Sequence, residues 1–161
     1  MRRFLLSVAL GGLLAACSGA PLSIAITVEP VDVSLISDGA IYFQKAGQMQ
    51  KPPVGVKEIG LEGTANFTDR GVLHFYATDQ EPDCPIIGSF FRCSSPSAAT
   101  MDDLGTLDFS KNSTSPLKWS GAHLTNGVNN QTLYIGVKLE SLGLTSGRLS
   151  FENLVAKVVL F

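Results

Sequence analysis

Charged residues are scarce in this sequence, and neither sign dominates. The 161 residues include 12 Lys plus Arg and 14 Asp plus Glu, which gives a formal net charge of −2 at pH 7. The charges are scattered and form no run of like sign. A chain without a basic run does not attract the phosphates of nucleic acid or an anionic lipid surface by charge. We therefore expect no nucleic acid among its partners.

The sequence also lacks the short motifs that carry common catalytic chemistry. It contains neither the GxSxG pattern of a nucleophilic serine nor the HExxH pattern of a zinc enzyme. The nearest approach, Gly143 to Gly147, reads GLTSG and places the serine one position late. The only two histidines, His74 and His123, lie in separate predicted strands. We therefore predict that the protein is not an enzyme and that it uses no cofactor.

Long hydrophobic runs are missing as well, apart from one at the N-terminus. Arg2 and Arg3 precede an apolar stretch of eleven residues, Phe4 to Leu14. As a helix, this stretch would span about 16 Å, which is too short for the roughly 30 Å hydrocarbon core of a bilayer. A positive segment, a short apolar core and the small residues Ala15 and Ala16 are typical of a cleavable signal peptide. The segment therefore predicts export and does not predict a membrane span.

Residues 14–17 read LAAC and resemble the lipobox of bacterial lipoprotein signal peptides. The resemblance covers residues 1–17 only. It implies that residues 1–16 are cleaved and that Cys17 becomes the N-terminus, with acyl chains such as palmitate on its thiol and amine. Residues 17–21 would then be a short tether. The resemblance thus implies a lipoprotein anchored in the cell membrane or outer membrane of a bacterial envelope, facing the periplasm or the cell surface.

The mature chain would have 145 residues, enough for one domain with a hydrophobic core. Its two remaining cysteines, Cys84 and Cys93, form an even pair in an oxidising compartment, which predicts a disulfide. A ring of about ten residues would stabilise the fold by about 2.5 to 3 kcal/mol in the chain-entropy model.

Residues 22–161 are predicted to form a single β domain. Apolar and polar residues alternate in short runs, most clearly from Leu133 to Leu139, and turn residues separate the runs at intervals of about ten residues. Such a pattern favours an antiparallel β-sandwich of immunoglobulin-like architecture, with a closed β-barrel as the runner-up. A barrel in the outer membrane is disfavoured, because Lys157 would face lipid there.

Four local expectations accompany this fold. Pro30 should interrupt the first extended segment, since proline cannot donate to a β-ladder. The apolar positions of the last strand change phase at Glu152-Asn153, which predicts a β-bulge. Residues 98–104 are the one helix candidate. Residues 117–124 are predicted to be a strand, followed by a turn at Asn126-Gly127.

Three carboxylates, Asp79, Glu81 and Asp83, are spaced as at the start of an EF-hand calcium loop. The sixth position of that loop is Cys84 instead of glycine and the twelfth is Phe90 instead of glutamate, which excludes an EF-hand. An irregular calcium site is the alternative to a plain solvated loop.

The segment between the two cysteines reads CPIIGSFFRC and predicts a hairpin with Gly88-Ser89 as a type II′ turn. Ile87 would then pair with Phe90 on one face of the ribbon. We expect these two side chains to form an exposed contact for a partner or for the bilayer. The alternative is that they are packed in the core.

These expectations favour a membrane-anchored envelope lipoprotein that acts as a non-catalytic binding or structural module with an envelope protein as its partner. Two alternatives stay open. One is a carrier or receptor for a small apolar ligand held between the sheets, and the other is an unrecognised hydrolase.

Overall fold

The structure, a computed structural model, describes residues 22–52, 56–94 and 100–158. One sheet contains five strands: β1 (Leu22–Ala25), β2 (Val31–Ile36), β4 (Ile59–Phe67), β9 (Thr114–Ser120) and β11 (Leu144–Val158). The other contains six strands: β3 (Ile41–Lys45), β5 (Val72–Thr78), β6 (Ile86–Ile87), β7 (Phe90–Cys93), β8 (Asp102–Asp108) and β10 (Tyr134–Leu139).

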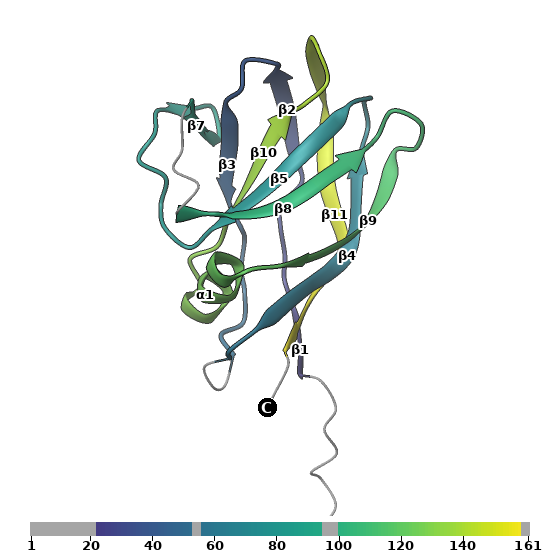
Figure 1. Ribbon diagram of the computed structural model, residues 1–161. Coiled ribbons are helices and arrows are strands. Elements are labelled where there is room, and N and C mark those ends of the chain that lie inside the picture. The colour runs from purple at the N-terminus through teal and green to yellow at the C-terminus, as the bar shows by residue number, and fades with distance from the viewer. Residues whose placement is uncertain (1–21, 53–55, 95–99, 159–161) are drawn as a thin grey trace, which may run out of the picture.

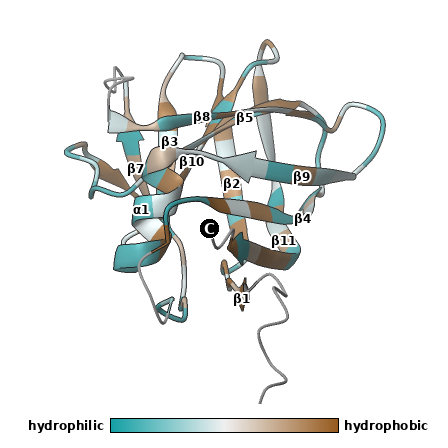
Figure 2. Cartoon of the chain, turned by 60° about the horizontal axis from the view of Figure 1, so that its bottom comes forward, coloured by the Kyte–Doolittle hydropathy of each residue, from teal (hydrophilic) through white to brown (hydrophobic). Residues whose placement is uncertain are grey.

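The two antiparallel sheets pack face to face, so the predicted β-sandwich is confirmed and the runner-up, a closed barrel, is not found (Figure 1). Hydrophobic and hydrophilic residues alternate along the strands, as Figure 2 shows, because successive side chains point to opposite faces of a sheet. The inward set forms the core. Its largest fully buried members include Phe67 and Leu61 from one sheet and Phe75 and Leu73 from the other.

Strand β11 spans the whole length of its sheet. It pairs with β4 along one edge, while β2 and β1 pair end to end along its other edge. Leu144, the first residue of β11, pairs with Ile36, and its last residue, Val158, pairs with Leu22. At a rise of about 3.3 Å per residue, these two ends of the sheet lie at most about 45 Å apart. The interruption between β1 and β2 contains Pro30, as the sequence predicted.

The predicted β-bulge in the last strand is confirmed. The register between β11 and β4 shifts between Glu152 and Val155, and Asn153 has a φ of +53°. The extra residue returns Leu154 to the buried face, on which Leu149 lies before the shift.

Residues 122–130 contradict the sequence-based prediction of a strand end and a turn. They form the helix α1 (Ala122–Asn130), which packs against β4, β5 and β8. The N-cap residue, Gly121, has no side chain with which to cap the helix, and the carboxylate of Asp102 takes this role from β8. Its Oδ2 accepts a hydrogen bond from the Leu124 N–H at 2.7 Å. This contact is worth about 1 kcal/mol in a typical N-cap and joins residues that are far apart in sequence.

Burial also favours the helix. Leu124 and Val128 are fully buried, and Thr125 Oγ1 accepts a hydrogen bond from the Ile59 N–H at 3.1 Å. Gly127 was expected to form a turn, but it serves close packing, since a Cβ there would lie 3.0 Å from Leu133. The helical turn predicted for residues 98–104 is wrong from Asp102 onward, where strand β8 begins, whereas Thr100 has 3₁₀-helical conformation. Residues 98–99 lie outside the described residues.

Candidate functional site

A second hydrophobic cluster covers the outer face of the six-stranded sheet, on the side away from the core. Its buried members come from β3, β5, β7 and β10, and they are Ile41, Phe43, Tyr76, Cys93 and Tyr134. Gly136 permits this cluster, because a Cβ at that position would lie 2.5 Å from a ring carbon of Phe43. An outer sheet face that is apolar must be covered to exclude water. Here Phe91, Cys84 and Met101 pack against it.

The predicted disulfide is present and belongs to this cover. Cys84 and Cys93 are bonded with Cα atoms 5.3 Å apart, which is longer than the 4.5 Å spacing of a regular non-hydrogen-bonded pair. The hairpin has the predicted register, with Ile87 paired to Phe90. Gly88 has a φ of +62°, as the first central position of a type II′ turn requires.

The prediction that Ile87 and Phe90 are both exposed is correct for Ile87 and wrong for Phe90. Phe90 is 9% exposed and belongs to the main core, where its ring meets Tyr42 edge-to-face with centroids 6.3 Å apart. The two outermost side chains of the hairpin are Ile86 and Ile87, exposed by 68% and 54%. The reason is strand position, because β7 pairs with β3 and lies over the core, whereas Ile86 and Ile87 are on β6, the edge strand of the sheet.

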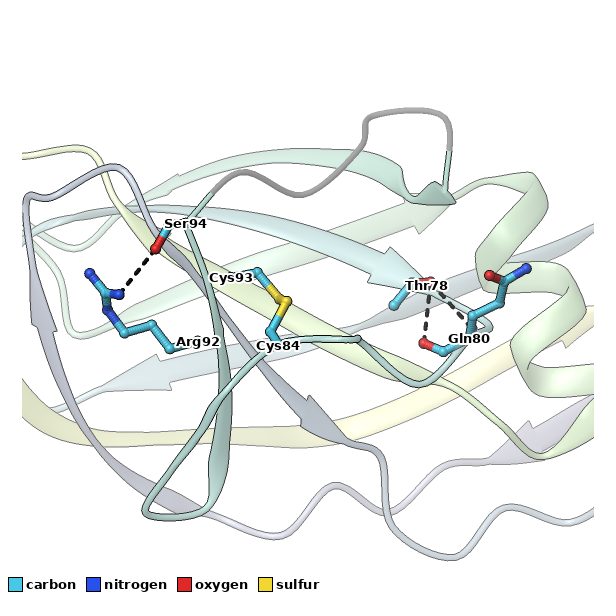
Figure 3. The surroundings of a disulfide bond; sticks show 6 residues. All are labelled: Thr78, Gln80, Cys84, Arg92, Cys93 and Ser94. Carbon is cyan, nitrogen blue, oxygen red and sulfur yellow. Dashed lines mark hydrogen bonds between the residues drawn. A yellow bond between two sulfur atoms is a disulfide. The ribbon is translucent and has the colours of Figure 1, made fainter.

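A cavity of about 300 Å³ lies beside the disulfide, over the outer face of the six-stranded sheet. Its walls are the end of β5, the loop from β5 to β6, and the residues just before β8 (Figure 3). Phe43, Met101 and the disulfide supply apolar surface, and Glu81 and Asp83 supply carboxylates. The cavity between the sheets, beside Phe90, is only about 10 Å³, room for no more than a water molecule. It gives no support to a carrier with its ligand between the sheets.

The three carboxylates considered for calcium do not converge. Asp79 Oδ1 lies 2.7 Å from Nδ1 of His123, whereas Glu81 accepts a hydrogen bond from the Tyr134 hydroxyl at 3.2 Å. Across the described ranges, no three His, Cys, Asp or Glu side chains form a group that could hold a metal ion. Asp79 is directed to His123, whereas Glu81 and Asp83 line the cavity, so the arrangement gives no support to the calcium alternative.

His74 lies between two carboxylates on the solvent side of the six-stranded sheet. Its Nε2 is 2.6 Å from Asp103 Oδ1, and its Nδ1 is 3.2 Å from Glu140 Oε1. The hydrogen bond with His74 is the main cause of the lowered pKa of Asp103. The pKa of Glu140 is also lowered, mainly by the hydrogen bond that it accepts from Lys138. Because both ring nitrogens face carboxylates, neither is directed at a hydroxyl nucleophile. The cluster is a surface ion network and lacks the nucleophile–base pair of a hydrolase.

Three exposed apolar side chains gather at one end of the five-stranded sheet. Ile36, Leu142 and Leu144 are exposed by 45%, 98% and 68%, and we call them the apolar tip. Leu144 pairs with Ile36, and the Ser37 N–H donates to the Gly143 carbonyl at 2.9 Å, so the segments lie side by side. Sequence analysis missed this tip. The sequence nevertheless contains a signal for exposure at this point. Leu142 lies between Ser141 and Gly143, where no alternation of apolar and polar residues predicts a strand that would bury it.

The predicted lipidation site Cys17, together with the predicted signal peptide and tether, lies outside the described residues. None of the helices that the structure describes has the length and apolarity needed to cross a bilayer. Comparison of the chain with models of protein families, with curated proteins and with solved structures found no match.

Proposed function

We propose that the protein is an exported lipoprotein, anchored through acyl chains on Cys17, that acts as a non-catalytic binding module and presents the apolar tip to an envelope protein. One observation carries this proposal: the apolar tip and the N-terminal strand lie at opposite ends of β11 (Figure 1). A tether of four residues after Cys17 would reach at most about 14 Å. The tip would then stand up to about 45 Å beyond the anchored end of the domain.

Exposure of the tip supports a partner at that end. A leucine that is 98% exposed beside two further exposed apolar side chains gains nothing for the stability of the domain. Contiguous exposed apolar residues on a soluble domain mark interaction sites, because a partner would remove them from water. The tip is also remote from the anchoring bilayer, which favours a protein as the partner.

The anchor is tested by moving the protein to a different signal peptide. Residues 1–16 are exchanged for a secretory signal with an ordinary cleavage site, and Cys17→Ser is introduced. We expect this variant to leave the membrane pellet for the soluble fraction after a high-salt wash, because two or three acyl chains at about 0.8 kcal/mol per buried methylene hold the native form. The tagged native chain is the control. A variant that stays in the pellet would show that Cys17 is not the anchor.

The tip is tested by comparing two pairs of exposed apolar residues. In membranes of the native host, Leu142→Ser with Leu144→Ser should abolish the cross-linked complex that the native protein forms. The control is Ile86→Ser with Ile87→Ser, which removes two exposed apolar side chains from the disulfide hairpin and should keep the complex. Both pairs should alter the free energy of unfolding by about 0.5 kcal/mol or less per residue, since the side chains are exposed. Equal recovery of the complex with both variants would contradict docking at the tip.

A further inference from the structure

The cavity beside the disulfide is separate from the apolar tip, and its composition indicates a ligand of definite charge. Its volume of about 300 Å³ lies at the lower end of the range typical of small-molecule sites. Of the lining residues that the structure describes, Glu81 and Asp83 are acidic and none is Lys, Arg or His. Any ion that enters therefore meets negative charge only.

These carboxylates have no basic partner within the described ranges. The salt bridges there involve other acidic residues, Asp32, Asp38, Glu62, Asp79, Asp103 and Glu140. Arg92, the neighbour of Cys93 in the chain, pairs with Asp38 and donates to Ser94 at 3.1 Å. Figure 3 shows Arg92 on the opposite side of the disulfide from Thr78 and Gln80, which line the cavity.

One of the two carboxylates is also held in place. The Tyr134 hydroxyl donates to Glu81 Oε2 at 3.2 Å, and Tyr134 itself is only 4% exposed. A carboxylate fixed by a buried tyrosine loses less conformational entropy when it binds a ligand than a free side chain would. Its second oxygen, Oε1, can still accept a hydrogen bond from a ligand.

The rest of the cavity suits a short aliphatic body. Phe43, Met101 and the disulfide are apolar and polarisable, and an aromatic ring attracts a cation as well as an alkyl chain. We propose that this cavity binds a small alkylammonium compound, with the ammonium group at Glu81 and Asp83 and the alkyl chain against Phe43 and Met101. The proposal does not depend on the apolar tip or on its partner.

Methionine methyl groups allow the proposal to be tested on the mature lipoprotein. The chain has three methionines, and Met1 belongs to the cleaved segment. Met101 lines the cavity, whereas Met49 is buried in the main core and serves as the internal control. With methyl-labelled methionine, butylammonium should shift the Met101 resonance in a saturable manner and leave that of Met49 unchanged. Equal shifts of both resonances, or no saturable shift, would overturn the proposal.

Matched probes and variants separate charge from hydrophobic binding. 1-Butanol should bind about tenfold more weakly than butylammonium, and butanoate should bind more weakly still. The double variant Glu81→Gln with Asp83→Asn should weaken butylammonium about tenfold, whereas Asp32→Asn, which removes an exposed carboxylate on β2, should have no effect. If butanol equals butylammonium, or if both variants behave alike, the cavity does not select a cation. Neither result bears on docking at the tip, which is measured by cross-linking.

Discussion

Replacement of Phe90 by serine is expected to lower the free energy of unfolding by about 3 to 5 kcal/mol, the loss typical of removing a buried aromatic ring from a core. Phe90 is 9% exposed, packs edge-to-face on Tyr42 and belongs to the main hydrophobic core. Serine would leave a cavity there and place a hydroxyl among apolar side chains. Denaturant unfolding of the exported form without acyl chains measures this effect free of any lipid contribution.

The neighbouring hairpin residue supplies the control for Phe90. Ile87 is the cross-strand partner of Phe90 and is 54% exposed, so Ile87→Ser should cost far less, about 0.5 kcal/mol. Phe90→Leu should fall between the two serine variants, because leucine restores part of the buried area. Similar losses for Phe90→Ser and Ile87→Ser would mean that Phe90 does not pack between the sheets.

Removal of the disulfide by Cys84→Ala with Cys93→Ala should lower the free energy of unfolding by about 2.5 to 3 kcal/mol. The bridge closes a ring with a sequence separation of 9, and the estimate is the loop entropy that it removes from the unfolded chain. For a domain of this size the loss corresponds to a fall in Tm of roughly 5 to 10 °C. Thermal unfolding followed by circular dichroism measures it.

Reduction of the native protein is the control for the alanine variant. Both treatments open the same ring, so the Tm of the reduced native protein should fall to about that of the double variant. The double variant itself should not respond to reductant. If reduction leaves the native Tm unchanged although both thiols become titratable, the loop-entropy account of this bridge is wrong.

The elements that were predicted well are those in which near neighbours decide the structure. The hairpin between Cys84 and Cys93 follows from a Gly-Ser turn between two apolar pairs, and its register is the predicted one. The bulge near Asn153 follows from a change in the phase of the apolar positions within one strand. Such a change can be seen in any sequence whose apolar and polar residues alternate. The β-sandwich follows from the same period repeated in many short runs.

The elements that were mispredicted depend on residues distant in the chain. Helix α1 has Asn126-Gly127 at its centre, a strong turn signal, yet Asp102 caps it and Leu124 and Val128 are buried beneath it. The strand from Asp102 to Asp108 was likewise hidden, because a register irregularity at Leu104 interrupts the alternation of its residues.

The candidate sites divide in the same way. The sequence alone determined the lipobox resemblance at Cys17, the pairing of Cys84 with Cys93, and the alternation that makes the chain a β-sandwich, because each is written in adjacent or regularly spaced residues. Only the tertiary structure decided that Phe90 is buried while Ile86 is exposed, and that a cavity opens beside the disulfide. A hairpin has two strands, and its sequence does not say which of them pairs with the rest of the sheet; here β7 pairs with β3 and β6 is left at the edge. That choice is made by the shape and area of the surface on which the hairpin packs.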